Sequence, residues 1–264
     1  MKSKALWLIS IFCLIALGVV GVMLWGRGQK TPKPQEQVEP AATPTTNTTL
    51  PPTPTPTPVP KPTTPPAATP VKNPTTLLLS VPFTPQAPTG NWDELHNEAC
   101  EEASAIMAAA YFAGDTRAEL PAAEVEKQIA TLTTWQQTNF GYSLDTTAAE
   151  TAEMIRSVYK LKAELVTGVT ESKIKAALLA NQIVIVLVNG RLIGNPYYKA
   201  PGPIYHMLVV RGFTSTRLVT NDPGTKRGEN YSYDFATIIN ATVDWDHTTD
   251  TIDDSKSVMI VVSK

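Results

Sequence analysis

The sequence predicts an α+β domain over residues 77–264, with helices in its first part and an antiparallel sheet in its second part. Between residues 98 and 180, apolar side chains recur at helical spacing behind helix start signals. From residue 183 onward, short β-branched runs separated by turn residues replace that pattern. Helices that precede strands, rather than alternate with them, are typical of an α+β fold. The segment is long enough for one domain with a substantial core.

A membrane anchor is predicted ahead of this domain. Residues 1–4 carry two lysines, and residues 5–25 contain no charged side chain. As a helix, the uncharged stretch is long enough to cross about 30 Å of hydrocarbon. A cleaved signal peptide is the alternative, but the apolar run is longer than a usual signal core and no A-x-A-like cleavage site follows it. We therefore expect a single-pass protein of the cell membrane with a short cytoplasmic N-terminus.

Residues 26–76 form a predicted disordered linker. Between residues 31 and 76 the chain has 15 prolines and 14 threonines, and few branched aliphatic side chains. Such a composition cannot bury enough apolar surface to fold, and its prolines favour an extended chain. Because a spacer of this kind suits a domain held away from the bilayer, we expect residues 77–264 to lie outside the cytoplasm.

The charge of the domain argues against a nucleic-acid partner. Residues 77–264 contain 15 of the 22 basic residues of the chain and 22 of its 24 acidic residues, so their net charge is −7. The chain has two cysteines, Cys13 in the predicted anchor and Cys100 in the domain. A cysteine inside the membrane segment cannot form a disulfide with one in the domain, so we expect Cys100 to be a free thiol.

Helix start signals place four helices in the first part of the domain. A strand over Leu77–Phe83 and a proline-rich loop come first. Asn97 is a suitable N-cap for a helix that carries Cys100 in its first turn. Thr147 and Glu150 have the spacing of a capping box. The four helices are predicted to begin at residues 97, 120, 147 and 170, and the last three to end near residues 134, 160 and 180.

The second part of the domain is predicted to consist mainly of strands. Residues 183–188 are a continuous β-branched run, as expected of a strand that is buried on both faces. A hairpin is expected to turn at Thr214-Ser215 and to stop at Asn221-Asp222-Pro223-Gly224. The predicted strands cover residues 183–188, 205–210, 217–220 and 258–262, and a short helix covers residues 234–240.

Cys100 is the candidate nucleophile. Backbone N–H groups converge at the first turn of a helix, and the helix dipole lowers the pKa of a thiol placed there. Glu98, Glu101 and Glu102 have the opposite effect unless their carboxylates point into solvent. A reactive thiol at this place therefore requires a basic partner elsewhere in the chain. Without such a partner, Cys100 is a small, inert, buried residue.

His206 and Asp222 supply a base and a group to orient it. A hairpin that turns at Thr214-Ser215 places His206 opposite Asp222 or Pro223, within one residue of register. A thiol, an imidazole and a carboxylate make up the nucleophile, base and orienting group of acyl-transfer enzymes. Asn221 competes with Asp222, because adjacent side chains of a strand point to opposite faces and only one can face His206.

These residues resemble those of a known family. A cysteine helix behind a loop with Gln and Trp, a His-Met-Leu-Val-Val strand and an Asn-Asp-Pro-Gly turn are similar to stand-alone relatives of the double-glycine leader peptidases, which are papain-like cysteine peptidases. The resemblance covers about residues 81–262. It implies a papain-like fold, with Cys100 as nucleophile, His206 as general base, Asp222 as orienting residue and Gln86 as side-chain donor of the oxyanion hole. Unlike the family, Cys100 is followed by two glutamates in place of the commoner Gly-Pro or Gly-Ala.

The resulting expectation is a membrane-anchored, extracytoplasmic cysteine peptidase that hydrolyses a peptide or protein substrate of the cell envelope. Two alternatives stay open. In one, the thiol acts on another acyl bond, as in a cell-wall amidase or acyl transferase. In the other, the domain is a non-catalytic surface binding module in which Glu101 and Glu102 detune the thiol. We expect no cofactor and no metal, because no second pair of zinc-ligand spacing accompanies His96 and Cys100.

Overall fold

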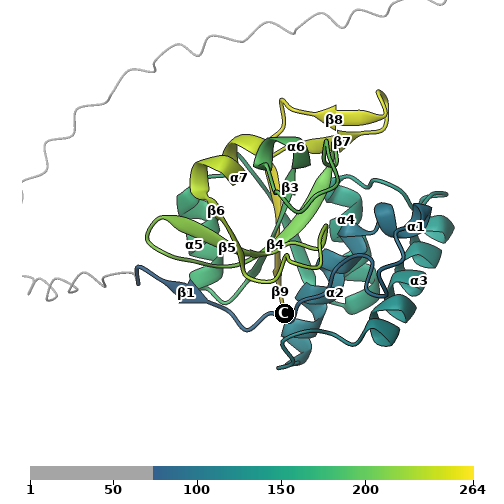
Figure 1. Ribbon diagram of the computed structural model, residues 1–264, viewed down its shortest axis with the longest axis horizontal. Coiled ribbons are helices and arrows are strands. Elements are labelled where there is room, and N and C mark those ends of the chain that lie inside the picture. The colour runs from purple at the N-terminus through teal and green to yellow at the C-terminus, as the bar shows by residue number, and fades with distance from the viewer. Residues whose placement is uncertain (1–73) are drawn as a thin grey trace, which may run out of the picture. The chain divides into compact units, whose positions relative to one another are not determined.

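The computed structural model describes residues 74–264, which fold as an α+β domain around a seven-stranded sheet (Figure 1). The prediction of an α+β fold with an antiparallel sheet is confirmed, since every strand pair of this sheet is antiparallel. The predicted cytoplasmic segment, anchor and linker lie outside the described residues, apart from residues 74–76. Within residues 74–264, none of the helices has both the length and the apolar character of a membrane span.

Helices dominate the chain between residues 94 and 179. They are α1 (Glu94–Asn97), α2 (Cys100–Ala113), α3 (Ala122–Asn139), α4 (Ala148–Tyr159) and α5 (Glu171–Leu179), and two short helices follow among the strands, α6 (Gly190–Ile193) and α7 (Phe235–Ala241). The predicted start of α4 is confirmed, because Thr147 and Glu150 cap it reciprocally. The predicted start of α5 is also confirmed, since the Thr170 side chain accepts a hydrogen bond from the backbone N–H of Lys173.

The start of α2 differs from the prediction. Asn97 does not cap this helix, because it is the last residue of α1, whose own N-cap is Asp93. Ala99 occupies the N-cap position of α2 and makes no side-chain capping bond. The Asn97 side chain instead donates to the backbone oxygen of Trp92. Cys100 is therefore the first residue of α2, where a backbone N–H has no acceptor within the helix.

The sheet has the strand order β2-β9-β3-β4-β5-β6, and β1 also pairs with β4. Its strands are β1 (Leu77–Leu78), β2 (Lys162–Thr167), β3 (Ile183–Val188), β4 (His206–Phe213), β5 (Arg217–Asn221), β6 (Tyr231–Asp234) and β9 (Val258–Ser263). The prediction of a fully buried strand at β3 is confirmed, because β3 lies between β9 and β4 and all its residues are buried. β2, β6 and a separate hairpin of β7 (Asp244–Asp246) and β8 (Thr251–Asp253) were not predicted.

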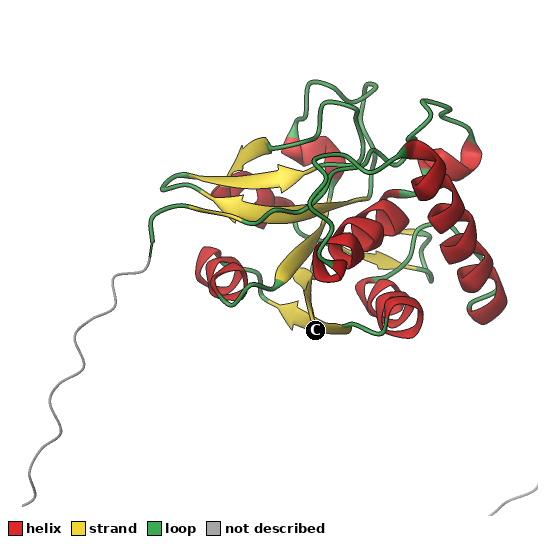
Figure 2. Ribbon diagram, turned by 90° about the horizontal axis from the view of Figure 1, so that it is seen from below, coloured by secondary structure: helices red, strands yellow, loops and turns green. Residues whose placement is uncertain are grey.

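Helices cover both sides of the strands. Figure 1 shows α1 to α4 on one side of the sheet, and α5 and α7 on the other. In the first group, α2 packs on β4, α4 packs on β2 and β9, and α3 lies against α2 and α4 (Figure 2). Ile106 and Met107 of α2 are fully buried, and burial of such a side chain contributes roughly 1.5–3 kcal/mol. The packing of α2 on β4 fixes Cys100, the first residue of the helix, against the start of the strand.

The hairpin of β4 and β5 turns one residue later than predicted. It closes between Thr214 and Arg217, and a register shift in β4 follows, so that Val209 pairs with Asn221. Continued along the strands, this register puts His206 across from Gly224, at the far end of the predicted range. A Cβ atom on residue 224 would lie 2.9 Å from Cε1 of His206, so the close approach of the imidazole requires glycine there.

Candidate active site

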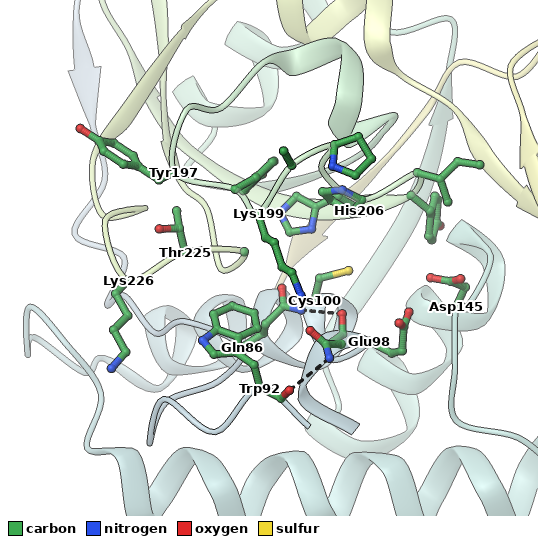
Figure 3. A pocket seen from close by; sticks show the side chains of 18 of the residues that line it. Gln86, Trp92, Glu98, Cys100, Asp145, Tyr197, Lys199, His206, Thr225 and Lys226 are labelled. Atoms are coloured by element: carbon green, nitrogen blue, oxygen red, sulfur yellow. Dashed lines mark hydrogen bonds between the residues drawn. The ribbon is translucent and has the colours of Figure 1, made fainter. Parts of the chain in front are cut away.

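A cleft of about 1070 Å³ brings three of the four predicted site residues together. Cys100, His206 and Gln86 all line it, and Figure 3 shows them near its centre. Cys100 begins α2, His206 begins β4, and Gln86 comes from the loop ahead of α1. Asp222, the fourth residue, follows directly after β5, is fully buried and contacts His206 from behind.

Cys100 is a buried free thiol with two polar contacts. Its side chain is 4% exposed. The backbone N–H of Met207 donates to the Cys100 Sγ at 3.4 Å, and the thiol donates to the Glu101 Oε2 at 3.0 Å. The first contact follows from the packing of α2 on β4, because Met207 is the second residue of that strand. The thiol is thus held beside His206, which precedes Met207 in the chain.

Glu101 and Glu102 point into the protein, a direction that the sequence left open. Both side chains are buried, and the Glu101 Oε1 accepts a hydrogen bond from the backbone N–H of Thr146 at 3.1 Å. Burial raises the pKa of Cys100 well above its usual value, and the Glu101 carboxyl raises it further. These effects outweigh the helix start, so the lowered thiol pKa expected from that position is wrong for the unliganded protein.

The carboxyls around the thiol favour their protonated forms. Burial, followed by the charges of Glu102 and Asp145, raises the pKa of Glu101 well above its usual value. Burial also raises the pKa of Glu102 to about 7. Within residues 74–264, the Glu102 Oε2 has no hydrogen-bond partner, and a buried carboxylate oxygen without a partner favours the protonated acid. The cysteine therefore lies in an environment that disfavours negative charge.

The imidazole and the carboxylate are directly hydrogen-bonded. His206 Nε2 and Asp222 Oδ1 are 2.9 Å apart, and both side chains are nearly inaccessible to solvent. Burial alone would raise the pKa of Asp222, but the His206 charge and hydrogen bonds from His206, Tyr233 and Tyr198 lower it below its usual value. Asp222 is thus held as a carboxylate that fixes the ring of His206 through Nε2, so the other ring nitrogen, Nδ1, takes no part in this bond.

Asn221 has a different set of partners. Its Nδ2 donates to the backbone oxygens of Val81 and Pro82, at 3.1 Å and 3.2 Å. Its Oδ1 accepts from the guanidinium of Arg211 and from the backbone N–H of Asn230. Adjacent positions of an extended segment face opposite ways, and here residue 222 faces the imidazole. Of the two candidates left open by the sequence, only Asp222 contacts His206.

Three residues around Asp222 were missed by the sequence analysis. Asn195 Nδ2, Tyr198 OH and Tyr233 OH all donate to the Asp222 Oδ2, at 3.0, 2.7 and 2.7 Å. Tyr198 also lies edge-on to the His206 ring, with 5.4 Å between the centroids. The loop that carries Asn195 and Tyr198 and the strand β6 that carries Tyr233 have no sequence spacing that relates them to Asp222. Their convergence follows only from the tertiary fold.

Gln86 lies in the cleft with its donor already engaged. Its Nε2 donates to the backbone oxygens of His96 and Asn97, at 2.9 Å and 2.8 Å. Its Oε1 is buried and has no hydrogen-bond partner within the described residues. The two carbonyl acceptors fix the orientation of the amide, since the reverse orientation would bring its oxygen against both of them. Gln86 therefore ties the loop ahead of α1 to the end of that helix.

Metal-ligating groups are not clustered in the described chain. Within residues 74–264, no group of three or more His, Cys, Asp or Glu side chains has a geometry that could hold a metal ion. His96 is directed away from Cys100, because its ring nitrogens contact the carboxylates of Asp93 and Glu126 at 2.7 Å and 2.9 Å. The site is built from a thiol, an imidazole and carboxyl groups.

Comparison with known proteins identifies the family of the chain. The Peptidase_C39 like family matches residues 78–253 of the chain. A crystal structure from Bacillus anthracis, described as a C39-like peptidase, matches with a TM-score of 0.46 and 16% identity, over 72% of this chain and 98% of that chain. A search of the curated proteins found no match. Since the family match covers most of the chain, the resemblance seen in the sequence is confirmed, and the protein belongs to the C39-like peptidase family.

Proposed function

We propose that the protein is a cysteine peptidase in which Cys100 is the nucleophile, His206 the general base and Asp222 the residue that orients it. The observation that carries the proposal is the bond of His206 Nε2 to the buried Asp222 carboxylate, in the same cleft as the only cysteine of the described chain. Acyl transfer through a thiol requires a nucleophile, a base that takes its proton and a carboxylate that orients the base. Membership of a peptidase family supports a peptide bond as the target.

The environment of the thiol indicates how the reaction would begin. Because burial and Glu101 raise the pKa of Cys100, the resting state is a thiol rather than a thiolate. His206 Nδ1 therefore takes the proton as the sulfur attacks the carbonyl carbon, and Asp222 stabilises the imidazolium. The imidazolium then protonates the leaving amine, and water hydrolyses the thioester with His206 again as the base.

Two donors are proposed for the oxyanion of the tetrahedral intermediate. The backbone N–H of Cys100 is at the helix start and has no acceptor within α2. The second donor is Gln86 Nε2, which would exchange one of its two carbonyl acceptors on α1 for the oxyanion. Such a donor contributes about 10²- to 10³-fold in rate in enzymes of this kind.

A non-catalytic binding module is the second candidate function, and the raised pKa of the Cys100 thiol favours it. A thiol that is held beside a buried carboxyl reacts slowly unless a substrate changes its surroundings. The amidase or acyl transferase alternative shares every residue of the proposed mechanism and differs only in the acyl bond that is attacked. The catalytic functions and the binding module can be distinguished by how fast the thiol reacts with an electrophile that occupies the cleft.

We therefore predict two different alkylation profiles for Cys100. A small reagent such as iodoacetamide should label it slowly at pH 7 and faster as the pH rises, because the thiol pKa is raised. A peptide with an electrophilic carbonyl should label it much faster at pH 7, since binding places a carbonyl where His206 can assist the attack. Mass spectrometry of the full chain measures both rates. Equal slow labelling by both reagents would leave the binding module as the function.

Glu101→Gln is the matched variant for this experiment. The amide keeps the size of the side chain and an acceptor for the Thr146 N–H, but unlike the carboxyl it cannot ionise beside the thiol as the pH rises. The profile for iodoacetamide should shift to lower pH, because one cause of the raised pKa of Cys100 is removed. Glu153→Gln, an exposed position on α4, is the control and should leave the profile unchanged.

We also propose that residues 5–25 anchor the protein in the cell membrane and that residues 26–76 hold the domain on the outer side, close to envelope substrates. The uncharged stretch and the proline- and threonine-rich composition support this arrangement. Protease added to intact cells should release a fragment that contains Cys100. Protection of that fragment until the cells are lysed would contradict the proposed topology.

A further inference from the structure

The cleft around Cys100 carries opposite charges on its two sides. Glu98, the residue after α1, and Asp145, in the segment between α3 and α4, line it on one side. Figure 3 shows both on the same side of Cys100, with Lys226 on the opposite side and the Lys199 side chain extending toward Cys100 between them. A substrate that crosses the thiol therefore meets an acidic wall and a basic wall.

The acidic wall has no cation of its own. Within residues 74–264, neither Glu98 nor Asp145 takes part in an ion pair, although exposed acids such as Glu124 do. Burial raises the pKa of Glu98. Burial followed by the charge of Glu98 raises the pKa of Asp145 to about 7. Neither carboxyl is therefore paired with a cation, although Lys199 lines the same cleft and the charge of His247 acts to lower the pKa of Asp145. A ligand cation between the two carboxyls would relieve their repulsion.

A third acceptor on the same lining also lacks a donor. Gln86 is 4% exposed, its Nε2 is held by two backbone oxygens, and its Oε1 has no partner in the described part of the chain. Buried acceptors are normally satisfied, so this atom is open to a donor from outside the chain. A lysine ammonium has three N–H donors and a guanidinium has five, and neither has an acceptor. The unmatched acceptors of the cleft thus fit a cationic group with several donors.

Apolar side chains at the rim suit the stem of such a group. Trp92 and Ile204 line the cleft and are 41% and 38% exposed, which is high for large apolar residues. The methylene chain of a lysine or arginine packs on apolar surface while its charged end reaches polar partners. The apolar rim can therefore contact the methylene chain of a lysine or arginine while the acidic wall binds its charged end.

We propose that Glu98 and Asp145 are specificity residues that bind a lysine, arginine or other amine-bearing side chain of the substrate, close to the bond that Cys100 attacks. This proposal rests on the proposed peptidase function, because it assigns the bound side chain to a substrate that is cleaved. Binding of the side chain can nevertheless be measured without turnover. A metal ion is a poorer match for this wall, because no three potential ligands are clustered within residues 74–264.

The first test compares paired peptides that differ only in lysine or norleucine at each position near the scissile bond. The full chain should hydrolyse the lysine peptide with a kcat/KM at least about tenfold higher at one of these positions, as for a partly desolvated charge pair. Glu98→Gln and Asp145→Asn should each reduce that ratio severalfold, and the double variant should bring it close to one. Glu153→Gln and Asp254→Asn, both exposed and away from the cleft, should keep the wild-type ratio.

The second test measures binding without chemistry. Cys100→Ala full chain should bind the preferred lysine peptide about tenfold more tightly than its norleucine partner, measured by fluorescence anisotropy. Hydrolysis without a preference for lysine at any position would overturn the specificity proposal and leave the peptidase function intact. Lysine-dependent binding without hydrolysis by the wild type would support the site and contradict the peptidase function. Equal binding of both peptides to Cys100→Ala would overturn the site.

Discussion

Cys100→Ala is expected to abolish peptide hydrolysis, with a loss of at least about 10⁴-fold in kcat/KM. The reason is that no other cysteine occurs in the described domain, and Cys100 lines the same cleft as His206 from the first position of a helix. The measurement is the rate of cleavage of a peptide that the wild type hydrolyses, at a concentration well below KM so that kcat/KM is obtained directly.

The variant is expected to remain folded. Alanine leaves the Met207 N–H without the sulfur as acceptor, at a cost of about 1–2 kcal/mol in the free energy of unfolding. Thermal denaturation separates this effect from the catalytic one. Cys100→Ser is the matched control, because its hydroxyl keeps both polar contacts but is a much weaker nucleophile than a thiol. Serine should thus restore stability without restoring activity, and substantial hydrolysis by Cys100→Ala would end the assignment of this thiol as nucleophile.

Local signals in the sequence were sufficient for much of the fold. The capping box at Thr147 and the cap at Thr170 depend on residues within one helical turn, so they could be found without tertiary information. The run Ile183–Val188 has a branched apolar residue at nearly every position, which only a strand covered on both faces can bury. His206 could be placed near Asp222 because the two strands of a short hairpin pair, which brings residues on either side of the turn opposite one another.

The features that escaped prediction depend on contacts between distant segments. Asn97 has the chemistry of an N-cap, but a short helix capped by Asp93 ends on it, and the next helix starts without a capping side chain. Tyr198 and Tyr233 are ordinary aromatic residues until the fold brings both hydroxyls to Asp222. No periodicity or spacing marks such residues, because each belongs to a different segment.

The charge state of the thiol was the least predictable property of the site. Acidic residues in a first helical turn usually face solvent and stabilise the helix through its dipole. Here Thr146 and the segment before α4 cover Glu101, so its carboxyl is buried against the thiol. The sign of the pKa shift at Cys100 thus depends on which way one neighbouring side chain points, and only the packing of α2 against α4 determines that direction.

Asp222→Ala is expected to lower kcat by about 10³- to 10⁴-fold while leaving Cys100 open to small alkylating reagents. Alanine removes the acceptor of His206 Nε2, so neither the tautomer nor the orientation of the ring is fixed. It also leaves the hydroxyls of Tyr198 and Tyr233 without their acceptor in a buried place, at about 1–3 kcal/mol for each group. The variant should therefore lose both activity and stability, measured by steady-state kinetics and by denaturant unfolding.

The pH dependence of this loss has a definite sign. The pKa of Asp222 is lowered in the folded protein, so its charge stabilises the fold fully above the pKa of the unfolded chain, about 3.9. That contribution is lost as the pH falls through the lowered folded value. The difference in unfolding free energy between the wild type and Asp222→Ala should accordingly be largest above about pH 5 and should shrink on acidification. A difference that grows toward low pH would contradict the charged state assigned to Asp222.

Asp222→Asn distinguishes the charge of this residue from its geometry. The Asp222 Oδ1 accepts from His206 Nε2 and the backbone N–H of Gly224, whereas two of the three donors to Oδ2 are tyrosine hydroxyls, which can turn to accept from an amide. An asparagine is therefore expected to keep its oxygen on the side of His206. The imidazole then keeps its tautomer and loses only the neighbouring charge, so kcat should fall less than in Asp222→Ala. Asn221→Ala is the competing variant, and it should cost stability through Val81 and Pro82 but preserve activity per folded molecule. If Asn221→Ala silenced hydrolysis while Asp222→Ala left it intact, the orienting residue would be Asn221.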